Sequence, residues 1–141
     1  MKAKEYLRQL EKLDKLIENK LAEKEQWKAI ATSTTQQLTP DKVQSTSNPH
    51  KMADAIHKII EIEAEIDAYI DRLVDTKREV ISTIERLNPT EYDLLHKVYV
   101  QYFTFEEVAM RKDKSYSWVT TVHGRALKNL QGYLDEREQP K

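Results

Sequence analysis

One apolar seam, from Ile56 to Leu87, constrains the fold more than any other feature of this sequence. Its members recur at steps of three and four residues, and this spacing keeps them on one side of an α-helix, as in a coiled coil. The sequence therefore predicts one long helix. Glu63 and Lys77 are interior polar members of the seam, and such residues can specify the register in which helices pack against each other. The seam consists of Ile56, Ile59, Glu63, Ile66, Ile70, Leu73, Lys77, Val80, Ile84 and Leu87.

The boundaries of this helix carry recognisable signals. Asn48 is a good N-cap, and Pro49 has the fixed φ that suits the first helical position. The helix is expected to stop at Asn88-Pro89, because a residue before proline avoids the α region. Asn88 is then expected to cap a third helix from about Thr90 to Gln101.

A similar seam of Tyr6, Leu10, Leu13 and Ile17 predicts another long helix, from about Ala3 to Ile30. The segment that follows is rich in Thr, Ser and Gln and contains Pro40, so we predict a loop over residues 31–49. The helices on either side of this loop would form an antiparallel, coiled-coil-like hairpin over residues 1–87.

Charge favours that antiparallel pairing, because the first helix carries an excess of basic residues and the second an excess of acidic ones. Lys4, Arg8 and Lys12 could face acidic residues of the second helix, namely Glu61, Glu65, Asp71 and Asp75. The alternative is that these charges only form solvated helix faces. An exposed ion pair contributes only about 0.2–1 kcal/mol, so these charges would orient the helices without driving their association.

The apolar stripes are too wide for one hairpin to bury, so we expect copies of the chain to associate, with a dimeric four-helix bundle as the simplest solution. The sequence alone leaves a higher oligomer open. The predicted interface residues are Leu10, Leu13, Ile17, Ile59, Ile66, Ile70, Leu73 and Val80.

Composition agrees with an all-α chain. Of 141 residues, 33% are charged and only Gly124 and Gly132 are glycines, so nothing before His123 adopts a positive φ easily. There is no cysteine, and no apolar run approaches the roughly 18 residues of a membrane span. We expect a cytoplasmic protein without disulfides or a thiolate metal site.

Residues Thr104 to Leu134 predict two helices joined by a tight turn. Thr104 and Glu107 form a capping box for the first, and Ser115 caps the second. Five basic residues against one acid give the stretch from Val108 to Leu134 a local charge of +4 inside a nearly neutral chain. Such a pair of helices is typical of a helix-turn-helix, whose second helix enters the major groove of DNA.

Residues 87–130 resemble the fourth region of bacterial sigma factors. Phe103-Thr104-Phe105-Glu106-Glu107-Val108-Ala109 is similar to the Leu-Ser-Leu-Glu-Glu-Ile-Ala run of that family, and Arg125-Ala126-Leu127-Lys128-Asn129-Leu130 is similar to its closing run, at a spacing that fits without a gap. Asp113 stands where the family has glycine. The resemblance implies a three-helix, DNA-binding helix-turn-helix domain over residues 88–141.

The same resemblance assigns roles to side chains. The exposed first turns of the second helix hold the residues that correspond to base-reading positions, namely Tyr116, Ser117, Thr120 and Thr121. Basic residues around them would meet phosphates, which position a protein without reading sequence. These are Arg111, Lys112, Lys114, Arg125 and Lys128. Trp118 has three open roles: packing, contact with the DNA backbone, or insertion into a partner.

We find no constellation typical of an enzyme. The four histidines are scattered and lack metal-ligand spacing, and no glycine-rich phosphate loop or nucleophile elbow occurs. We expect no catalytic residues, no cofactor, no metal and no small-molecule substrate.

The expected function is sequence-specific binding of double-stranded DNA in transcription regulation. A helical hairpin before a sigma-like reader also resembles the ArpU and RinA groups of phage late-gene regulators, which implies action inside a bacterial host cell. Two alternatives remain: a DNA-packaging recognition subunit similar to a small terminase, or a module that binds RNA polymerase or a repressor.

Overall fold

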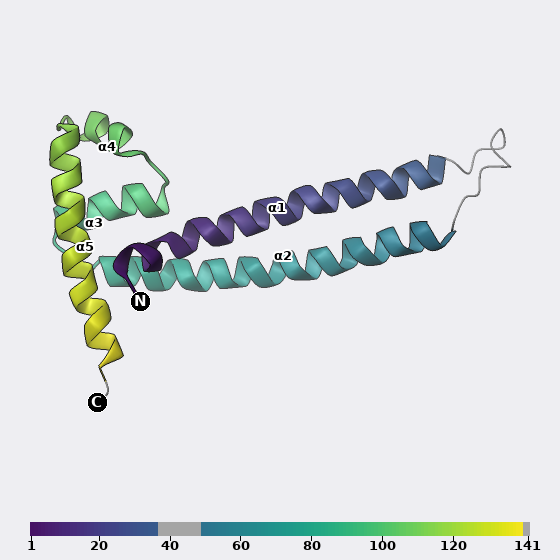
Figure 1. Cartoon of the computed structure of the whole chain (residues 1–141), viewed down its shortest axis with the longest axis horizontal. Helices are drawn as coiled ribbons and strands as arrows, with labels where there is room; N and C mark the ends of the chain where they lie inside the picture. The colour runs from purple at the N-terminus through teal and green to yellow at the C-terminus, as the bar shows by residue number, and fades with distance from the viewer. Residues whose placement is uncertain (37–48, 140–141) are drawn as a thin grey trace. The chain divides into compact units, whose positions relative to one another are not determined.

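The computed structural model describes residues 1–36 and 49–139, and every regular element in this part of the chain is a helix (Figure 1). The predicted all-α class is confirmed. In chain order the elements are α1 (Ala3–Gln36), α2 (Pro49–Ile84), α3 (Pro89–Leu95), the π-helical turn η2 (His96–Val100), α4 (Phe105–Lys112) and α5 (Tyr116–Glu138).

The first helix is longer than the sequence predicted. α1 continues through Ala31 to Gln36, so the predicted loop over residues 31–49 is wrong for its first six residues, and residues 37–48 of that loop lie outside the described part of the chain. Thr, Ser and Gln each cost less than about 1 kcal/mol in a helix, and growth of an existing helix adds one hydrogen bond per residue. α2 begins at Pro49 as predicted, whereas its predicted N-cap, Asn48, lies outside the described residues.

The chain divides into two compact units. Unit 1 contains residues 1–13 and 73–141, and unit 2 contains residues 14–72. The predicted division between residues 87 and 88 does not coincide with these units, because both the start of α1 and the end of α2 belong with the C-terminal helices.

In unit 2, α1 and α2 run antiparallel and side by side (Figure 1), with Ile62 and Ile66 buried. Lys20 Nζ lies 2.7 Å from Glu65 Oε2 and Lys24 Nζ lies 3.3 Å from Glu63 Oε1, so the residue numbers run in opposite directions. The hydrogen bond between Lys20 and Glu65 lowers the pKa of the carboxyl and raises that of the amine.

These pairs correct two details of the sequence analysis. Glu65 faces Lys20 and not Lys4, Arg8 or Lys12, because the buried seam sets the register and the surface charges follow it. Glu63 and Lys77 were expected in the interior, but both are exposed. The Glu63 side chain is about half exposed and reaches Lys24.

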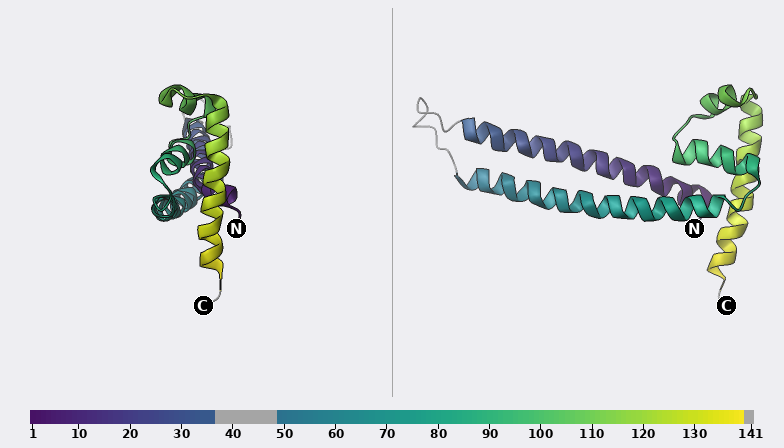
Figure 2. Two further views of the ribbon diagram at one scale, coloured as in Figure 1. Left: turned by 90° about the vertical axis from the view of Figure 1, so that its left-hand side faces the viewer. Right: turned by 180° about the vertical axis from the view of Figure 1, so that it is seen from behind.

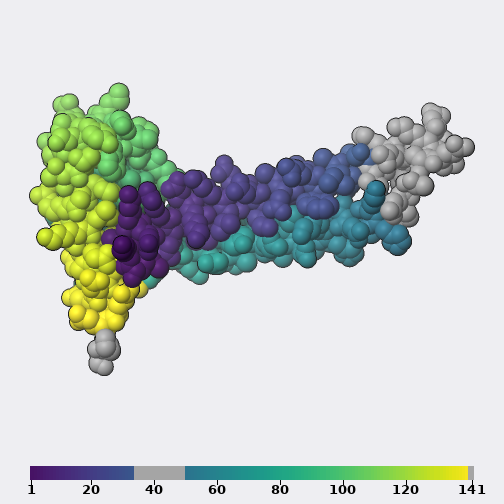
Figure 3. All heavy atoms as spheres, viewed as in Figure 1, coloured from purple at the N-terminus to yellow at the C-terminus, as the bar shows by residue number. Residues whose placement is uncertain are grey.

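In unit 1 the first turns of α1 and the end of α2 pack on α5. Leu7, Leu10, Ile84 and Leu130 are fully buried in this cluster. The hydroxyl groups of Tyr6 and Thr83 lie 2.9 Å apart inside it. Figure 3 shows the N-terminal residues, in purple, directly against the C-terminal half of α5, in yellow.

A second cluster in unit 1 joins α3, α4 and α5, which lie together in both views of Figure 2. Its buried residues come from all three helices and are Leu94, Val108, Ala109, Val119 and Val122. Val119 and Val122, three residues apart, lie on one face of α5.

Three predicted helix caps are present. The side chains of Asn88, Thr104 and Ser115 accept hydrogen bonds from the backbone N–H groups of Glu91, Glu107 and Trp118, at 2.9, 3.2 and 3.0 Å. The Thr104–Glu107 capping box is complete, since the Glu107 carboxylate also accepts from the Thr104 backbone. These caps satisfy N–H groups that the first turn of each helix leaves unpaired.

The third helix differs from its prediction, because α3 ends at Leu95 and the chain continues as the π-helical turn η2. The backbone N–H of Gln101 donates to the carbonyl of His96, five residues earlier, at 3.0 Å. Tyr102 then adopts a left-handed conformation with φ of 63°. This conformation is strained for a bulky residue.

α4 ends on a left-handed residue as well. Asp113 has φ of 54°, and the N–H of Lys114 donates to the carbonyl of Ala109 at 2.9 Å, as in a Schellman motif. The turn between α4 and α5 therefore forms without glycine, as expected from the tolerance of Asp for this conformation.

Replacing Asp113 tests that backbone strain. Asp113→Gly is expected to raise the free energy of unfolding by about 0.5–1 kcal/mol, because glycine adopts a positive φ without a Cβ clash. Asp113→Ala should lower it, because alanine has neither the freedom of glycine nor the local hydrogen bonding of aspartate. Urea unfolding followed by circular dichroism measures both, and equal stability of the two variants would contradict the strain.

Candidate nucleic-acid interface

The predicted base-reading residues lie on the exposed face of α5. Ser117, Thr120 and Thr121 are all exposed, and the hydroxyl groups of both threonines donate to the Ser117 carbonyl at 2.9 Å. Because these hydrogens are already used, each threonine offers a methyl group and oxygen lone pairs to a partner. Such groups suit the methyl of thymine and the amino groups of adenine and cytosine.

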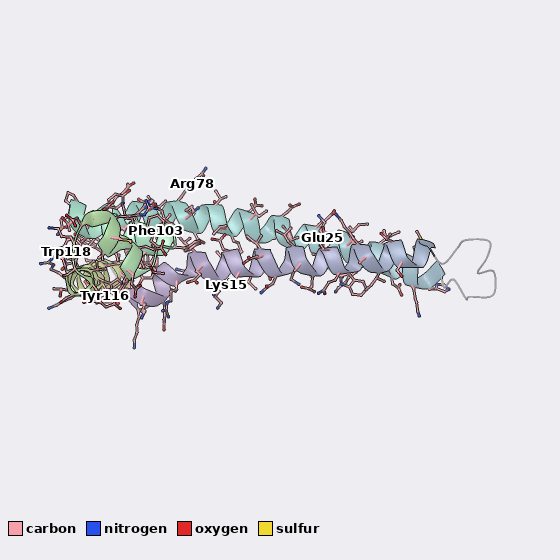
Figure 4. All side chains as sticks on the ribbon, turned by 90° about the horizontal axis from the view of Figure 1, so that it is seen from above. Lys15, Glu25, Arg78, Phe103, Tyr116 and Trp118 are labelled. Carbon is pink, nitrogen blue, oxygen red and sulfur yellow. The ribbon has the colours of Figure 1, made fainter. Side chains whose placement is uncertain are left out.

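Tyr116 stands at the edge of that face, at the first position of α5. Its side chain is 52% exposed, and its ring centroid lies 6.0 Å from that of Phe105 on α4. Figure 4 shows Tyr116, Phe103 and Trp118 at the end of unit 1 where α4 meets α5. The contact with Phe105 holds the Tyr116 ring near α4, and about half of Tyr116 stays exposed.

Gly124 lies on the same side of α5, one to two turns after Ser117, Thr120 and Thr121. A Cβ built on this glycine would meet no atom within 4 Å, and its φ is negative. The packing of the chain therefore gives no reason for glycine here, although glycine within a helix costs about 1 kcal/mol relative to alanine.

Two of the predicted phosphate contacts rest on aromatic rings. The Arg111 guanidinium lies 4.3 Å from the centroid of Phe103, and the Lys114 ammonium lies 5.6 Å from that of Trp118. Such contacts hold a cation in place while leaving its outer side open to an anion. Trp118 itself is half-buried against the α3–α4–α5 cluster. This contact corresponds to packing, one of the three roles that the sequence leaves open for Trp118.

Lys112 is engaged inside the chain. It forms an ion pair with Asp93 of α3, which also accepts from Lys97 at 2.6 Å. Partial burial raises the pKa of Asp93, but the hydrogen bonds from Lys112 and Lys97 outweigh this effect and lower it overall. A lysine held by a neighbouring carboxylate is less able to meet a phosphate.

Arg125 and Lys128 differ in their surroundings. Arg125 Nε lies 3.8 Å from the carboxylate of Glu91, whereas Lys128 is exposed on the side of α5 that carries Ser117 and Thr121. The structure thus brings Lys128 together with the predicted base-reading residues. Arg125 lies on the flank of the same helix.

Glu91 is a buried acid that was not among the predicted site residues. Only 1% of it is exposed, and it accepts from Asn129 Nδ2 at 2.8 and 3.2 Å and from Asn88 Nδ2 at 2.9 Å. These bonds tie the start of α3 to α5 behind Arg125. The Asn-x-x-Glu capping pattern at Asn88 indicates the local bond between Asn88 and Glu91. The bond from Asn129 on α5 is a tertiary contact, and no sequence pattern indicates it.

The predicted oligomerisation residues fall into different environments. Leu10, Leu13, Ile66 and Val80 are buried within the chain itself, and Ile17, Ile59 and Leu73 are partly buried. Ile70 is 41% exposed. Most of this set therefore packs the chain against itself, and its role between copies stays a prediction.

Within residues 1–36 and 49–139, no group of three or more His, Asp or Glu side chains is arranged to hold a metal ion. Over the same residues, no helix combines the length and apolar character that crossing a membrane requires.

His123 provides a pH test of this part of unit 1. Burial and the nearby Lys4 lower the pKa of its imidazole below 6.5, so the unfolded chain takes up a proton first as the pH falls. The free energy of unfolding should therefore decrease between about pH 7.5 and about pH 5.5. Urea unfolding at each pH should show a smaller decrease for His123→Gln, whereas His57→Gln should follow the wild type. Equal slopes for wild type and His123→Gln would refute this assignment.

Comparison of the chain with protein-family models, with curated proteins and with solved structures finds no match.

Proposed function

We propose that this protein is a dimeric regulator of transcription that binds double-stranded DNA through α5. The observation that carries the proposal is the exposed hydroxyl face of Ser117, Thr120 and Thr121, at the start of a helix that α4 braces from behind. On this proposal, α4, the Asp113 turn and α5 form a helix-turn-helix, and residues 88–141 make the DNA contacts. The resemblance to sigma region 4 supports the same interpretation.

The reading mechanism follows from the geometry of α5. An α-helix fits the major groove, where the threonine methyl groups and hydroxyl oxygens would meet base edges. Lys128 on the same face would contact a phosphate, as would Arg111 and Lys114 from their aromatic supports. Lys112 would contribute less, since it is paired with Asp93.

Exposed apolar residues of α2 support self-association. Ile56, Ile60 and Ile70 are 43%, 59% and 41% exposed, and helical periodicity places them on one side of the helix. We propose that these residues, more than the buried members of the predicted set, meet a second copy. A symmetric dimer would place its two α5 helices on half-sites about 34 Å apart or a multiple of that distance.

The cellular setting rests on the resemblance to phage late-gene regulators. It suggests a phage-encoded protein acting in the cytoplasm of a bacterial host, where RNA polymerase is a natural further partner. Neither an enzymatic reaction nor a cofactor forms part of the proposal.

One alternative has specific support. Of the basic residues around the hydroxyl face, Lys112 is paired with Asp93 and Arg125 stands beside buried Glu91. A surface with two of its five cations engaged in this way also suits a module that binds a protein, such as RNA polymerase, with little affinity for DNA. A DNA-packaging recognition subunit remains the other alternative.

The test of DNA binding is selection of duplexes from a random library by the purified full-length chain. The proposal expects enrichment of one sequence as two half-sites, retained over a nonspecific duplex. If the chain retains duplexes only at low salt and no sequence is enriched, specific DNA binding is refuted and the protein-binding alternative replaces it.

Variants of α5 test the two kinds of contact on the selected duplex. Thr121→Ala is expected to weaken binding to that site by about tenfold while changing nonspecific binding little. Lys128→Gln should weaken binding to every duplex and reduce the slope of log K against log salt by about one. Fluorescence anisotropy in a salt series measures both effects, with Lys28→Gln on α1 as the charge-matched control. Unchanged slopes for Lys128→Gln would contradict its role.

The proposed dimer has its own test. Ile60→Glu should weaken self-association by at least about tenfold, because the interface would have to bury an unpaired charge. Light scattering coupled to size-exclusion chromatography measures the mass over a range of concentrations. Met110→Glu is the matched control, since Met110 is an 83% exposed apolar residue of α4. A wild-type chain that remains monomeric would refute the dimer.

A further inference from the structure

A cavity of about 300 Å³ lies in unit 1, between the first turns of α1 and the segment that joins η2, α4 and α5. Its volume is at the lower end of the range for small-molecule sites. Aromatic rings and polar side chains line it in similar measure, and the polar ones include two cations of α1. Its lining includes Lys4, Arg8, Tyr99, Tyr102, Phe105 and His123.

The aromatic wall is held in a defined arrangement. The Tyr99 hydroxyl lies 2.7 Å from His123 Nε2, and the two rings are stacked with centroids 5.7 Å apart and planes 22° from parallel. Phe105 closes the wall with its centroid 4.8 Å from that of His123. These contacts fix the rings before any ligand arrives, which reduces the entropy cost of binding.

Two unusual backbone features lie at this cavity. Tyr99 belongs to the π-helical turn, and such turns occur frequently at functional sites. Tyr102 has a φ of 63°, which costs about 1–3 kcal/mol for a residue of this kind. Strained backbone of this sort is retained chiefly where a site requires it. The two features sit within three residues of each other, and both side chains line the cavity.

The electrostatic character of the cavity comes from α1. Lys4 and Arg8 are one helical turn apart, so they project on the same side. Burial and Lys4 both lower the pKa of His123, and Arg8 counteracts part of the rise that burial causes in the pKa of Tyr99. The contributions of Lys4 and Arg8 are those of a positive field, although Glu11 also lines the cavity and offsets part of it.

We propose that this cavity binds a small planar aromatic anion. The ring of the ligand would lie against Tyr99, Phe105 and His123, and its carboxylate or phosphate would face Lys4 and Arg8. Apolar walls with a few convergent polar groups are typical of small-molecule sites, and a charge-assisted bond to Arg supplies the preference for an anion. This proposal does not depend on DNA binding.

The test is a two-dimensional NMR titration of the full-length chain with 4-hydroxybenzoate and phenyl phosphate, and with neutral 4-hydroxybenzamide as the matched uncharged probe. Both anions should produce saturable shifts around His123 and Phe105, with an affinity about tenfold higher than that of the amide. A preference for one anion over the other identifies the charged group that the site accepts.

Variants locate the charge effect. Arg8→Gln and Lys4→Gln should each weaken binding of the anions by about tenfold and leave binding of the amide unchanged. Lys12→Gln, on the same helix and outside the cavity lining, should bind as the wild type does. The proposal is overturned if no probe saturates, if the amide binds as tightly as the anions, if shifts fall away from the cavity, or if Arg8→Gln binds anions as the wild type does.

Discussion

The burial of α1 against α5 is the interaction on which the rest of unit 1 depends. Leu7 and Leu10 share one apolar cluster with Leu130, and the Ala3 N–H donates to the side chain of Gln131, 128 positions away, at 2.7 Å. A fully buried leucine contributes about 1.5–3 kcal/mol, while the entropy cost of closing a loop grows only slowly with its length. A few buried leucines therefore offset the entropy cost of bringing the first turns of α1 against α5. The C-terminal half of α5 is anchored in this way, and its first turns carry the hydroxyl face.

The sequence predicted those parts of the structure that depend on local rules. The caps at Asn88, Thr104 and Ser115 involve residues three positions apart, so their spacing is visible in the chain itself. The seam of α2 was identified for the same reason, but it matches the buried face only in part. Ile66, Val80 and Ile84 are buried, whereas Ile56 and Ile70 are more than 40% exposed. The exposed face of α5 follows from its periodicity too, and Thr120 and Thr121 are exposed as expected.

Features that depend on tertiary contacts could not be predicted from the sequence. Nothing local indicated that Lys112 pairs with Asp93 or that Glu91 bonds Asn129, because each pair joins different helices. The sequence places the first turns of α1 and the end of α2 in a separate hairpin, whereas the structure packs them with the C-terminal helices. An apolar stripe indicates that a helix face is buried, but it does not indicate which element covers that face. The π-helical turn was also missed. A π-helical turn adds one residue to each hydrogen-bonded ring of the α-helix. The apolar pattern of α3 and η2 is too short to distinguish the α-helical period from the π-helical one.

The placement of glycine links the fold to the proposed reading face. Among the residues that the structure describes, Tyr102 and Asp113 are the non-glycine residues with positive φ, and they bear a backbone cost that glycine would relieve. Both glycines, by contrast, lie inside α5 at negative φ with open space around them. In a helix each glycine costs about 1 kcal/mol relative to alanine, so this distribution does not serve stability. Gly124 lies beside Thr120 and Thr121, where the absent side chain leaves helix backbone bare on the exposed face. Because glycine has no Cβ, a partner surface can approach the helix backbone more closely there than at any other residue type. A binding role for the exposed face of α5 would account for this otherwise unfavourable residue.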